Sequence, residues 1–421
     1  MTFPLTTCLL DNGLTVTAAR DELASGAAIN LWYRVGSADE TAGASGFAHL
    51  FEHLMFAGSA HVADGQHMVI LEALGGLTNA TTSFDRTNYF ETVPLGALPL
   101  ALWLEADRLA SLRVSPRTLA TQRAVVHEEK RQRYDNQPYG DQLELLLELG
   151  FPAGHPYCKP TIGVMSELDT ASLDDVRAFH RAWYRPGGAS LVVVSPLADE
   201  EVFRLADKYF GGVPAGDGTQ GAQREFAPLP ALEGVPRRSV TRPVPRSVLH
   251  LMWRLPPLRH PDHPAVSAAL DVLAAGQACR LQRSLVRDAG LAQSVGATDF
   301  GLTRGTSLGG ISAQPTPEAG MGSLENAMLE HLAELIANGP TEPEMRRVAA
   351  QTERDCFAEL ADPGDRADAI NEAVVVWGDA DHVNHQLDPW MALTPGDVAR
   401  AAATWLAPEK RAVLEYLAEE A

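Results

Sequence analysis

Apolar residues in the first half of the chain alternate in a pattern that predicts a β-sheet. Thr6 to Ala19 reads as two strands around Asp11-Asn12-Gly13, a turn whose residues tolerate positive φ. The apolar run 27–35 predicts a further strand, and residues 77–93, rich in Thr and aromatics, predict two more. Residues 189–195, Ala-Ser-Leu-Val-Val-Val-Ser, predict a buried strand. We expect these segments to form one sheet.

Helical patterns fill the stretches between the predicted strands. Neither Pro nor Gly interrupts residues 47–57, and residues 64–74 end at Gly75-Gly76, a common helix stop. Further helices are predicted at 94–112, 117–134 and 172–184, the last with Ser172 as its cap. Strands and helices therefore share each part of the chain, which indicates an α+β fold.

The second half of the chain echoes the first. A Val, a Trp and a Pro occur with the same spacing before a predicted strand in both halves. These residues are Val176, Trp183 and Pro186 in the first half and Val398, Trp405 and Pro408 in the second. Glycines and prolines are spread over residues 213–245, which predicts an extended surface linker. We therefore expect two homologous domains, 1–212 and 246–421, each an antiparallel β-sheet flanked by α-helices.

Composition narrows the classes of function. The 421 residues carry a formal net charge of -20, which disfavours binding to nucleic acid or to an anionic membrane. We expect no signal peptide in the first residues and no membrane-spanning run. The four cysteines are far apart and lack C-x-x-C pairing, which favours reduced thiols and a cytoplasmic protein.

Chemistry concentrates in one apolar segment, His49-Leu50-Phe51-Glu52-His53. On a helix, positions i and i+4 share a face, so His49 and His53 point the same way. Two imidazoles with an open water position suit a catalytic zinc, and a neighbouring non-ligand carboxylate, Glu52, is placed to take a proton from that water. The predicted second domain has no such motif; its corresponding region is roughly 270–286.

A third protein ligand is needed for a tetrahedral catalytic zinc. The predicted helix 117–134 carries His127, Glu128 and Glu129 after an apolar stretch. The chemistry of the residues does not choose among these three.

Several motifs together resemble the pitrilysin/insulinase family of zinc metallopeptidases, the inverzincins, which includes the mitochondrial processing peptidase. The resemblance covers nearly the whole chain, is most specific in the first half, and is nearest to a short bacterial branch with two homologous domains in one chain. It rests on residues 47–56, Gly75-Gly76, Asn79-Ala80-Thr81, Tyr89, residues 105–109 and Glu128-Glu129.

The resemblance implies the roles of the site residues. It gives His49, His53 and Glu129 as ligands of one Zn²⁺ per chain and Glu52 as the general base. Asn79, Ala80 and Thr81 match the edge strand on which the family holds its peptide substrate; an Asn that merely opens a strand is the alternative for Asn79.

Gln122 departs from the family pattern. It stands where the family often has a Glu, two turns before the third ligand on the same face. An amide can hydrogen-bond a neighbour of the metal ligands, but it adds no negative charge and accepts no proton.

A further departure concerns the second domain. Active members often place an Arg and a Tyr near the zinc to stabilise the oxyanion, and here Val286 and Gln293 occupy those positions. The resemblance therefore implies a zinc-bearing subunit that cleaves peptides or unfolded segments inside a closed cavity. Its partner would be a homologous chain that supplies Arg and Tyr, in a heterodimer, with a homodimer as the other form. A catalytically weak or inactive structural subunit is the alternative function.

Overall fold

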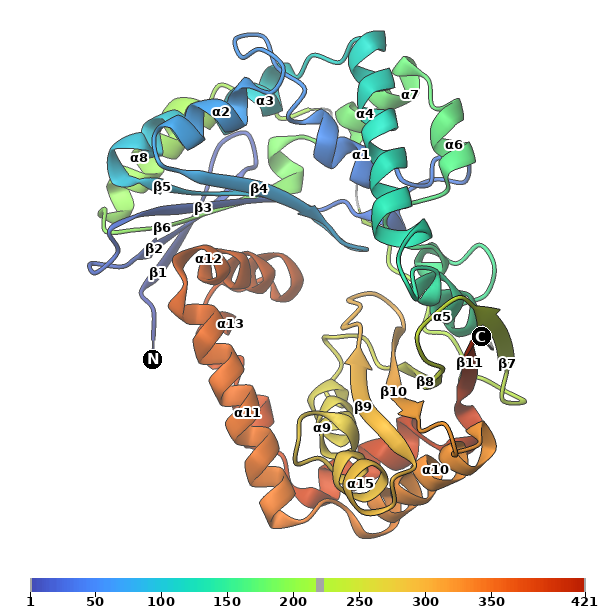
Figure 1. Ribbon diagram of the computed structural model, residues 1–421. Helices are drawn as coiled ribbons and strands as arrows, with labels where there is room; N and C mark the ends of the chain where they lie inside the picture. Colours follow the sequence, from blue (N-terminus) through green and yellow to red (C-terminus); the bar gives the residue numbers. More distant parts are fainter. Residues whose placement is uncertain (1, 217–222, 420–421) are drawn as a thin grey trace. The chain divides into compact units, whose positions relative to one another are not determined.

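Contacts divide the chain into two compact units. The computed structural model describes residues 2–216 and 223–419. One unit holds the described parts of Met1–Lys130, Lys159–Arg224 and Cys356–Gln386, and the other holds those of Arg131–Cys158, Glu225–Asp355 and Leu387–Ala421. Figure 1 shows the elements of both units.

The first unit is built on a six-stranded sheet in the order β1-β2-β6-β3-β5-β4. Only β2 and β6 run parallel; every other neighbouring pair is antiparallel. Strand β4 pairs with β5 alone and forms one edge of the sheet. The strands are β1 (Leu5–Leu9), β2 (Thr15–Arg20), β3 (Gly26–Tyr33), β4 (Leu77–Thr82), β5 (Thr87–Pro94) and β6 (Ala189–Ser195).

Helices cover both faces of this sheet (Figure 1). Helix α12, from the C-terminal half of the chain, packs against β3 and β6, where Ala367 and Ile370 join Ala28, Val192 and Val194 in a buried apolar cluster. The helices of the unit are α1 (Phe47–Leu54), α2 (Gln66–Ala73), α3 (Leu98–Ser111), α4 (Pro116–Lys130), α6 (Met165–Thr170), α7 (Leu173–Trp183), α8 (Asp199–Phe210), α12 (Pro363–Glu372) and α13 (His382–His385).

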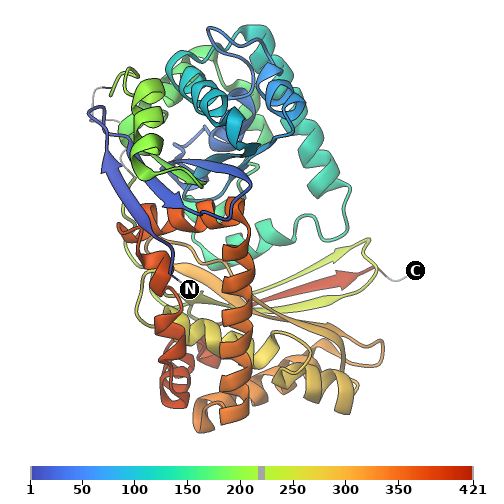
Figure 2. The ribbon, with the colours of Figure 1, turned by 90° about the vertical axis from the view of Figure 1, so that its left-hand side faces the viewer.

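The second unit is built on a five-stranded sheet in the order β7-β11-β8-β10-β9. Strands β7 and β11 run parallel and lie side by side in Figure 2, and the other pairs are antiparallel. Its strands are β7 (Arg237–Arg242), β8 (Val248–Leu255), β9 (Ala292–Asp299), β10 (Ser307–Pro315) and β11 (Ala412–Ala418). Its helices are α5 (Gln142–Gly150), α9 (His263–Ala274), α10 (Met321–Asn338), α14 (Asp388–Met391) and α15 (Pro395–Trp405), and α11 (Glu342–Ala361) runs from this unit into the first.

Strands β2 to β6 are arranged in the same order as strands β7 to β11, which confirms the predicted internal repeat; β1 has no counterpart in the second sheet. In each set of five, the last strand runs parallel to the first strand and antiparallel to the second: β6 with β2 and β3, β11 with β7 and β8. The helices before them begin alike, because Ser172 and Thr394 each form a capping box with an Asp three residues later. The predicted α+β architecture holds, with one parallel pair in each otherwise antiparallel sheet.

The units divide the chain differently from the predicted boundaries at 212 and 246. Residues 356–386 belong with the first sheet, and residues 131–158 belong with the second. The expected linker 213–245 contains a strand, β7, which pairs with β11 at the edge of the second sheet. Residues 217–222 of that linker lie outside the described residues.

The cysteines and the apolar character of the helices were also considered in the sequence. The four cysteines, all among the described residues, form no disulfide. Within the described ranges, none of the helices combines the length and the apolar character that crossing a membrane requires.

Candidate metal centre

The residue before helix α1, Gly46, occupies a position that favours glycine over other residues. Gly46 has φ 93°, and a Cβ there would lie 3.0 Å from the carbonyl oxygen of Ile162. No side chain of Gly46 can cap the helix, and Glu40 takes this role from a distance. Its two carboxylate oxygens accept hydrogen bonds from the backbone N–H groups of Gly46 and Ala48, each at 2.9 Å. The position of the helix start is thus fixed by Glu40.

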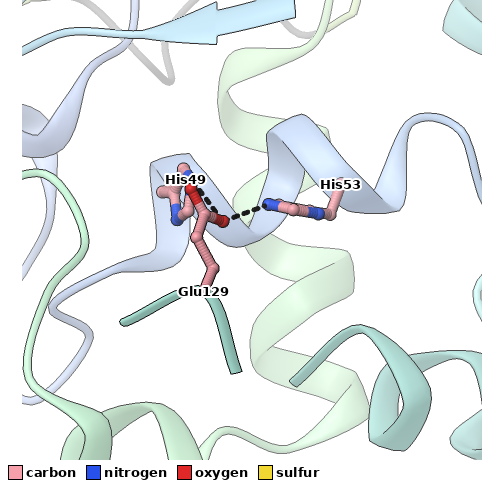
Figure 3. A group of neighbouring side chains, drawn as sticks. All are labelled: His49, His53 and Glu129. Carbon is pink, nitrogen blue, oxygen red and sulfur yellow. Dashed lines mark ion pairs between the residues drawn. The ribbon is translucent and has the colours of Figure 1, made fainter. Parts of the chain in front are cut away.

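The two histidines of α1 and Glu129 of α4 converge, as Figure 3 shows. The Nε2 atoms of His49 and His53 lie 3.5 and 3.3 Å from one carboxylate oxygen, Oε2 of Glu129. The three side chains are only 11 to 22% exposed. The structure therefore brings Glu129 to the histidines.

These distances fit a tetrahedral metal ion. Donors about 2.0–2.1 Å from a zinc ion are about 3.3 Å apart at the tetrahedral angle. The ligand atoms of His49, His53 and Glu129 all lie within 4.8 Å of one another. Two neutral imidazoles and one carboxylate are a donor set that zinc accepts, so the residues present fit this ion.

Glu52 lies on the same helix, beside the convergent histidines. The hydroxyl of Thr82, at the end of β4, donates a 2.6 Å hydrogen bond to Oε2 of Glu52. Burial raises the pKa of Glu52, while the Thr82 hydrogen bond and the nearby His53 act in the opposite direction. One carboxylate oxygen is thus held by the strand, which leaves the other for chemistry.

The predicted substrate segment lies on the edge strand β4. Asn79 and Thr81 are exposed, and Ala80 between them is buried. Oδ1 of Asn79 accepts the N–H of Ala80 at 2.9 Å, and the Thr81 hydroxyl donates to Asn88 at 2.6 Å. Because β4 pairs with β5 on one side only, its other edge has main-chain groups available to an added strand.

Of the three alternatives on helix α4 for the third ligand, Glu129 is the one that groups with His49 and His53 among the described residues. His127 contacts Asp169, with 2.8 Å between Nε2 and Oδ1, and takes no part in the group around Glu129. Gln122 precedes Glu129 by seven residues, hence on the same face, and is half-buried. Its side chain hydrogen-bonds no other residue within 2–216 and 223–419, so the expected contact to a neighbour of the ligands is not formed here.

A second cluster has ligand-type residues but a different character. His67, Glu91 and Glu105 are buried with their ligand atoms within 4.8 Å of one another. Here Arg108 supplies the positive charge: its guanidinium binds Glu105 through two nitrogens, one of them at 2.9 Å, and its Nη2 lies 3.7 Å from Glu91. The cation of this cluster is therefore a side chain, which disfavours a metal ion.

The two carboxyl groups of this buried cluster have pKa values that are shifted in opposite directions. Burial and the charge of Glu105 raise the pKa of Glu91 well above its ordinary value. Burial also opposes ionisation of Glu105, but the charge of Arg108 keeps the pKa of Glu105 below its ordinary value. Burial lowers the pKa of His67 to about 3. The surroundings thus favour a proton on Glu91 and a charged Glu105 beside Arg108, and the imidazole of His67 is neutral at pH 7.

The two departures in the second half lie in the second unit. Val286 belongs to the π-helical turn Gln282–Asp288, and Gln293 belongs to β9. Both are half-buried. Neither a valine nor a glutamine carries the positive charge of an Arg or the phenol of a Tyr.

Sequence reasoning missed Thr82, Glu40 and the buried cluster around Arg108. The period-2 alternation of β4 offered a signal for Thr82, because it places Thr82 on the face of buried Ala80. Neither the loop contact of Glu40 nor the ion pairs of Arg108 has a signature in local sequence.

Comparison with known protein families gives two matches along the chain. The model described as insulinase, peptidase family M16, matches residues 15–154, and the model described as the peptidase M16 inactive domain matches residues 170–352. Both models describe parts of the same peptidase family.

Curated relatives are named as proteases. Zinc protease PqqE of Helicobacter pylori is 28% identical over 404 residues, which covers 93% of this chain and 88% of that protein. An uncharacterized zinc protease of Streptomyces coelicolor is 25% identical over 405 residues, covering 93% of this chain and 85% of that protein. Coenzyme PQQ synthesis protein F of Pseudomonas aeruginosa is 33% identical over 211 residues, 49% of this chain and 27% of that protein.

Solved structures are similar over the full chain. A protease from Helicobacter pylori has a TM-score of 0.91 at 25% identity, covering 99% of this chain and 100% of that one. Pitrilysin has a TM-score of 0.80 at 19% identity, covering 99% of this chain and 45% of that one, a likeness of fold.

Proposed function

Because this chain belongs to the insulinase family of peptidases, family M16, we propose that it is a zinc-dependent endopeptidase that cleaves peptides or unfolded segments. The observation that carries the proposal is the convergence of His49, His53 and Glu129 at donor distances that suit a tetrahedral metal ion. The names of the relatives, zinc proteases, support the same metal.

In this proposal, His49, His53 and Glu129 hold one zinc ion per chain. A zinc ion in such a site supplies Lewis acidity that brings the pKa of a water molecule to about 7 and polarises a carbonyl group. We propose one ion per chain, because the second ligand-type cluster among the described residues already contains the guanidinium of Arg108.

Glu52 acts as the general base and then as the general acid. Its raised pKa brings the carboxylate nearer the range in which it can accept a proton from water and deliver it to the leaving amine. Thr82 holds Oε2 of Glu52, so Oε1 faces the reaction. The proton thus moves through one fixed carboxylate.

The peptide substrate binds as an added strand on β4. The outer edge of β4 offers main-chain donors and acceptors, which read the peptide backbone with little regard to its side chains. Asn79 and Thr81 extend from the exposed face of this strand. This mode favours extended, unfolded segments over folded proteins.

The proposal includes a partner chain. Val286 and Gln293 lack the groups that would stabilise an oxyanion, and a homologous chain with Arg and Tyr would supply them. Among the relatives, PqqE is by name a zinc protease, which supports a peptide or protein substrate. The second candidate function, a structural subunit of a processing complex, is favoured by the same two residues.

The proposal is tested with quenched fluorescent peptides and the full chain carrying one equivalent of zinc, alone and with a co-expressed homologue. We expect cleavage of internal peptide bonds and a loss of at least about a hundredfold in Glu52→Gln, with zinc content unchanged. Glu72→Gln, an exposed glutamate on α2, is the matched control and keeps full activity. Zinc-loaded chain that cleaves nothing under either condition would favour the structural subunit.

A further inference from the structure

A pocket of about 660 Å³ opens on the first unit, and none of His49, Glu52, His53 and Glu129 lines it. Its walls come from α1 at Phe51, from the loop that follows α1, from the connection between α3 and α4, and from α7. Phe51 is two residues from each histidine of α1, so the pocket adjoins a different face of that helix. The volume falls within the range of about 300–1,000 Å³ typical of small-molecule sites.

The polar part of this pocket is basic. Arg113, Arg177 and Arg181 line it, against a single carboxylate, Asp64. Arg177 lies 3.4 Å from Asp174, an exposed residue outside the lining. Arg113 and Arg181 form no ion pair with any residue in the described parts of the chain. Three guanidinium groups around one cavity run against the net charge of -20 and create a local site for an anion.

The inner part of the pocket is apolar and uncharged. Phe51, Val62 and Val176 form its buried floor, and the half-buried Leu112 and Val114 contribute the accessible hydrocarbon surface. His180 stacks on the ring of Phe51 at 6.2 Å, and burial together with the charge of Arg181 lowers the pKa of His180 to about 4. The imidazole is therefore neutral at pH 7 and adds no charge to this wall.

We propose that this pocket binds a small organic anion whose apolar body packs against Leu112 and Val114 and whose anionic group faces the arginines. Guanidinium groups bind carboxylates and phosphates through paired N–H donors, and the apolar wall gains from covering hydrocarbon. The carboxyl terminus of a short apolar peptide and an organic phosphate share this chemistry. The site does not depend on the peptidase function, because no residue of the metal centre takes part.

Isothermal titration of the full chain tests the proposal with three probes: N-acetyl-Leu-Phe, phenyl phosphate and inorganic phosphate. We expect at least one organic probe to bind with a Kd below about 1 mM, and inorganic phosphate to bind at least about tenfold more weakly. The stronger organic probe identifies the source as a peptide carboxylate or a phosphate ester. No binding of either organic probe at ten times that concentration, or equal binding of inorganic phosphate, would overturn the proposal.

Variants locate the site. Arg113→Ala and Arg181→Ala should each weaken the better organic probe by at least about tenfold, since each removes one charged hydrogen-bonding group. Both side chains are exposed, so the fold should survive. Arg204→Ala on α8, whose arginine pairs with Glu201 outside the pocket, is the matched control and should leave the affinity unchanged. Unchanged affinity in the Arg113→Ala/Arg181→Ala double variant would exclude this pocket as the site.

Discussion

Thr82 joins the proposed substrate strand to the proposed general base. Its hydroxyl lies at the end of β4 and donates to Glu52 on α1 at 2.6 Å. A peptide that adds to β4 would therefore bind to the strand that also fixes the orientation of the base. We infer that Thr82 is a positioning residue, because it acts through Glu52.

Thr82→Val should lower kcat by about ten- to a hundredfold and leave KM nearly unchanged, because the carboxylate loses the bond that orients it. Thr82→Ser, which keeps the hydroxyl, should restore most of the rate. Thr78→Val is the matched control, since the Thr78 hydroxyl makes no hydrogen bond to a residue in the described ranges. Steady-state kinetics decides: a kcat effect equal in Thr82→Val and Thr78→Val would argue against a special role for Thr82.

Glu91 and Glu105 are the same residue type, but their surroundings shift their pKa values in opposite directions. Both are fully buried, but Arg108 binds Glu105, and the pKa of Glu91 is raised well above its ordinary value. Glu91→Gln keeps a neutral group of the same shape and should lower the free energy of unfolding by about 1 kcal/mol or less. Glu105→Gln leaves Arg108 buried without its counter-charge and should lower it by about 3–5 kcal/mol.

Urea unfolding of the two variants, followed by circular dichroism at pH 7, measures this difference. Equal destabilisation by the two substitutions would mean that Glu91 carries a charge as Glu105 does. That result would also make the cluster of His67, Glu91 and Glu105 a candidate metal site again.

At the scale of elements, α1 depends on a residue outside it. The carboxylate of Glu40 accepts hydrogen bonds from the backbone N–H groups of Gly46 and Ala48, at the N-terminal end of the helix that carries both histidines. These bonds replace the side-chain cap that Gly46 lacks. The register of the histidines towards Glu129 therefore rests in part on this contact.

Glu40→Ala should lower the free energy of unfolding by about 1–2 kcal/mol, as the loss of a helix cap does, and weaken zinc binding by about tenfold or more. Urea unfolding and competition with a zinc chelator measure the two effects. Glu72→Ala, an exposed position on α2, is the control. Full zinc affinity in Glu40→Ala would show that α1 keeps its position without the cap.

Much of the element order followed from the sequence because it is written in local patterns. The hairpin at residues 11–13, strand β6 and the capping box at Ser172 all rest on neighbours in the chain, and each is present. The His49 and His53 spacing likewise needs only a helix. The choice of Glu129 came from the resemblance, because α4 presents three candidate ligands and local spacing does not say which one turns inward.

Features that depend on distant contacts were not predicted. Strand β7 lies at a sheet edge and is mostly polar and exposed, so its sequence alone resembles a linker. Its pairing with β11, a distant segment, makes it a strand. Residues 356–386 lie with the first sheet because Asp368 of α12 accepts hydrogen bonds from Asn30, Trp32 and Asn88 on β3 and β5. Those partners are about 280 or more residues away in the sequence.

At the scale of the whole molecule, the repeat has kept its topology in both units, but the proposed metal ligands are found in one. All three proposed ligands belong to the first unit. The inactive-domain model covers most of the second unit, which has Val286 and Gln293 at the positions where the family resemblance implies an Arg and a Tyr. The proposed partner chain is an answer to this asymmetry between the two copies.

Zinc content together with X-ray absorption at the zinc edge tests the central claim most directly. The account predicts one zinc ion per wild-type chain, with two imidazole nitrogens and a carboxylate oxygen at about 2.0–2.2 Å. It also predicts loss of that ion in the His49→Ala/His53→Ala/Glu129→Ala triple variant. A wild-type chain that takes up no zinc, or a triple variant that keeps one tightly bound ion, would contradict it.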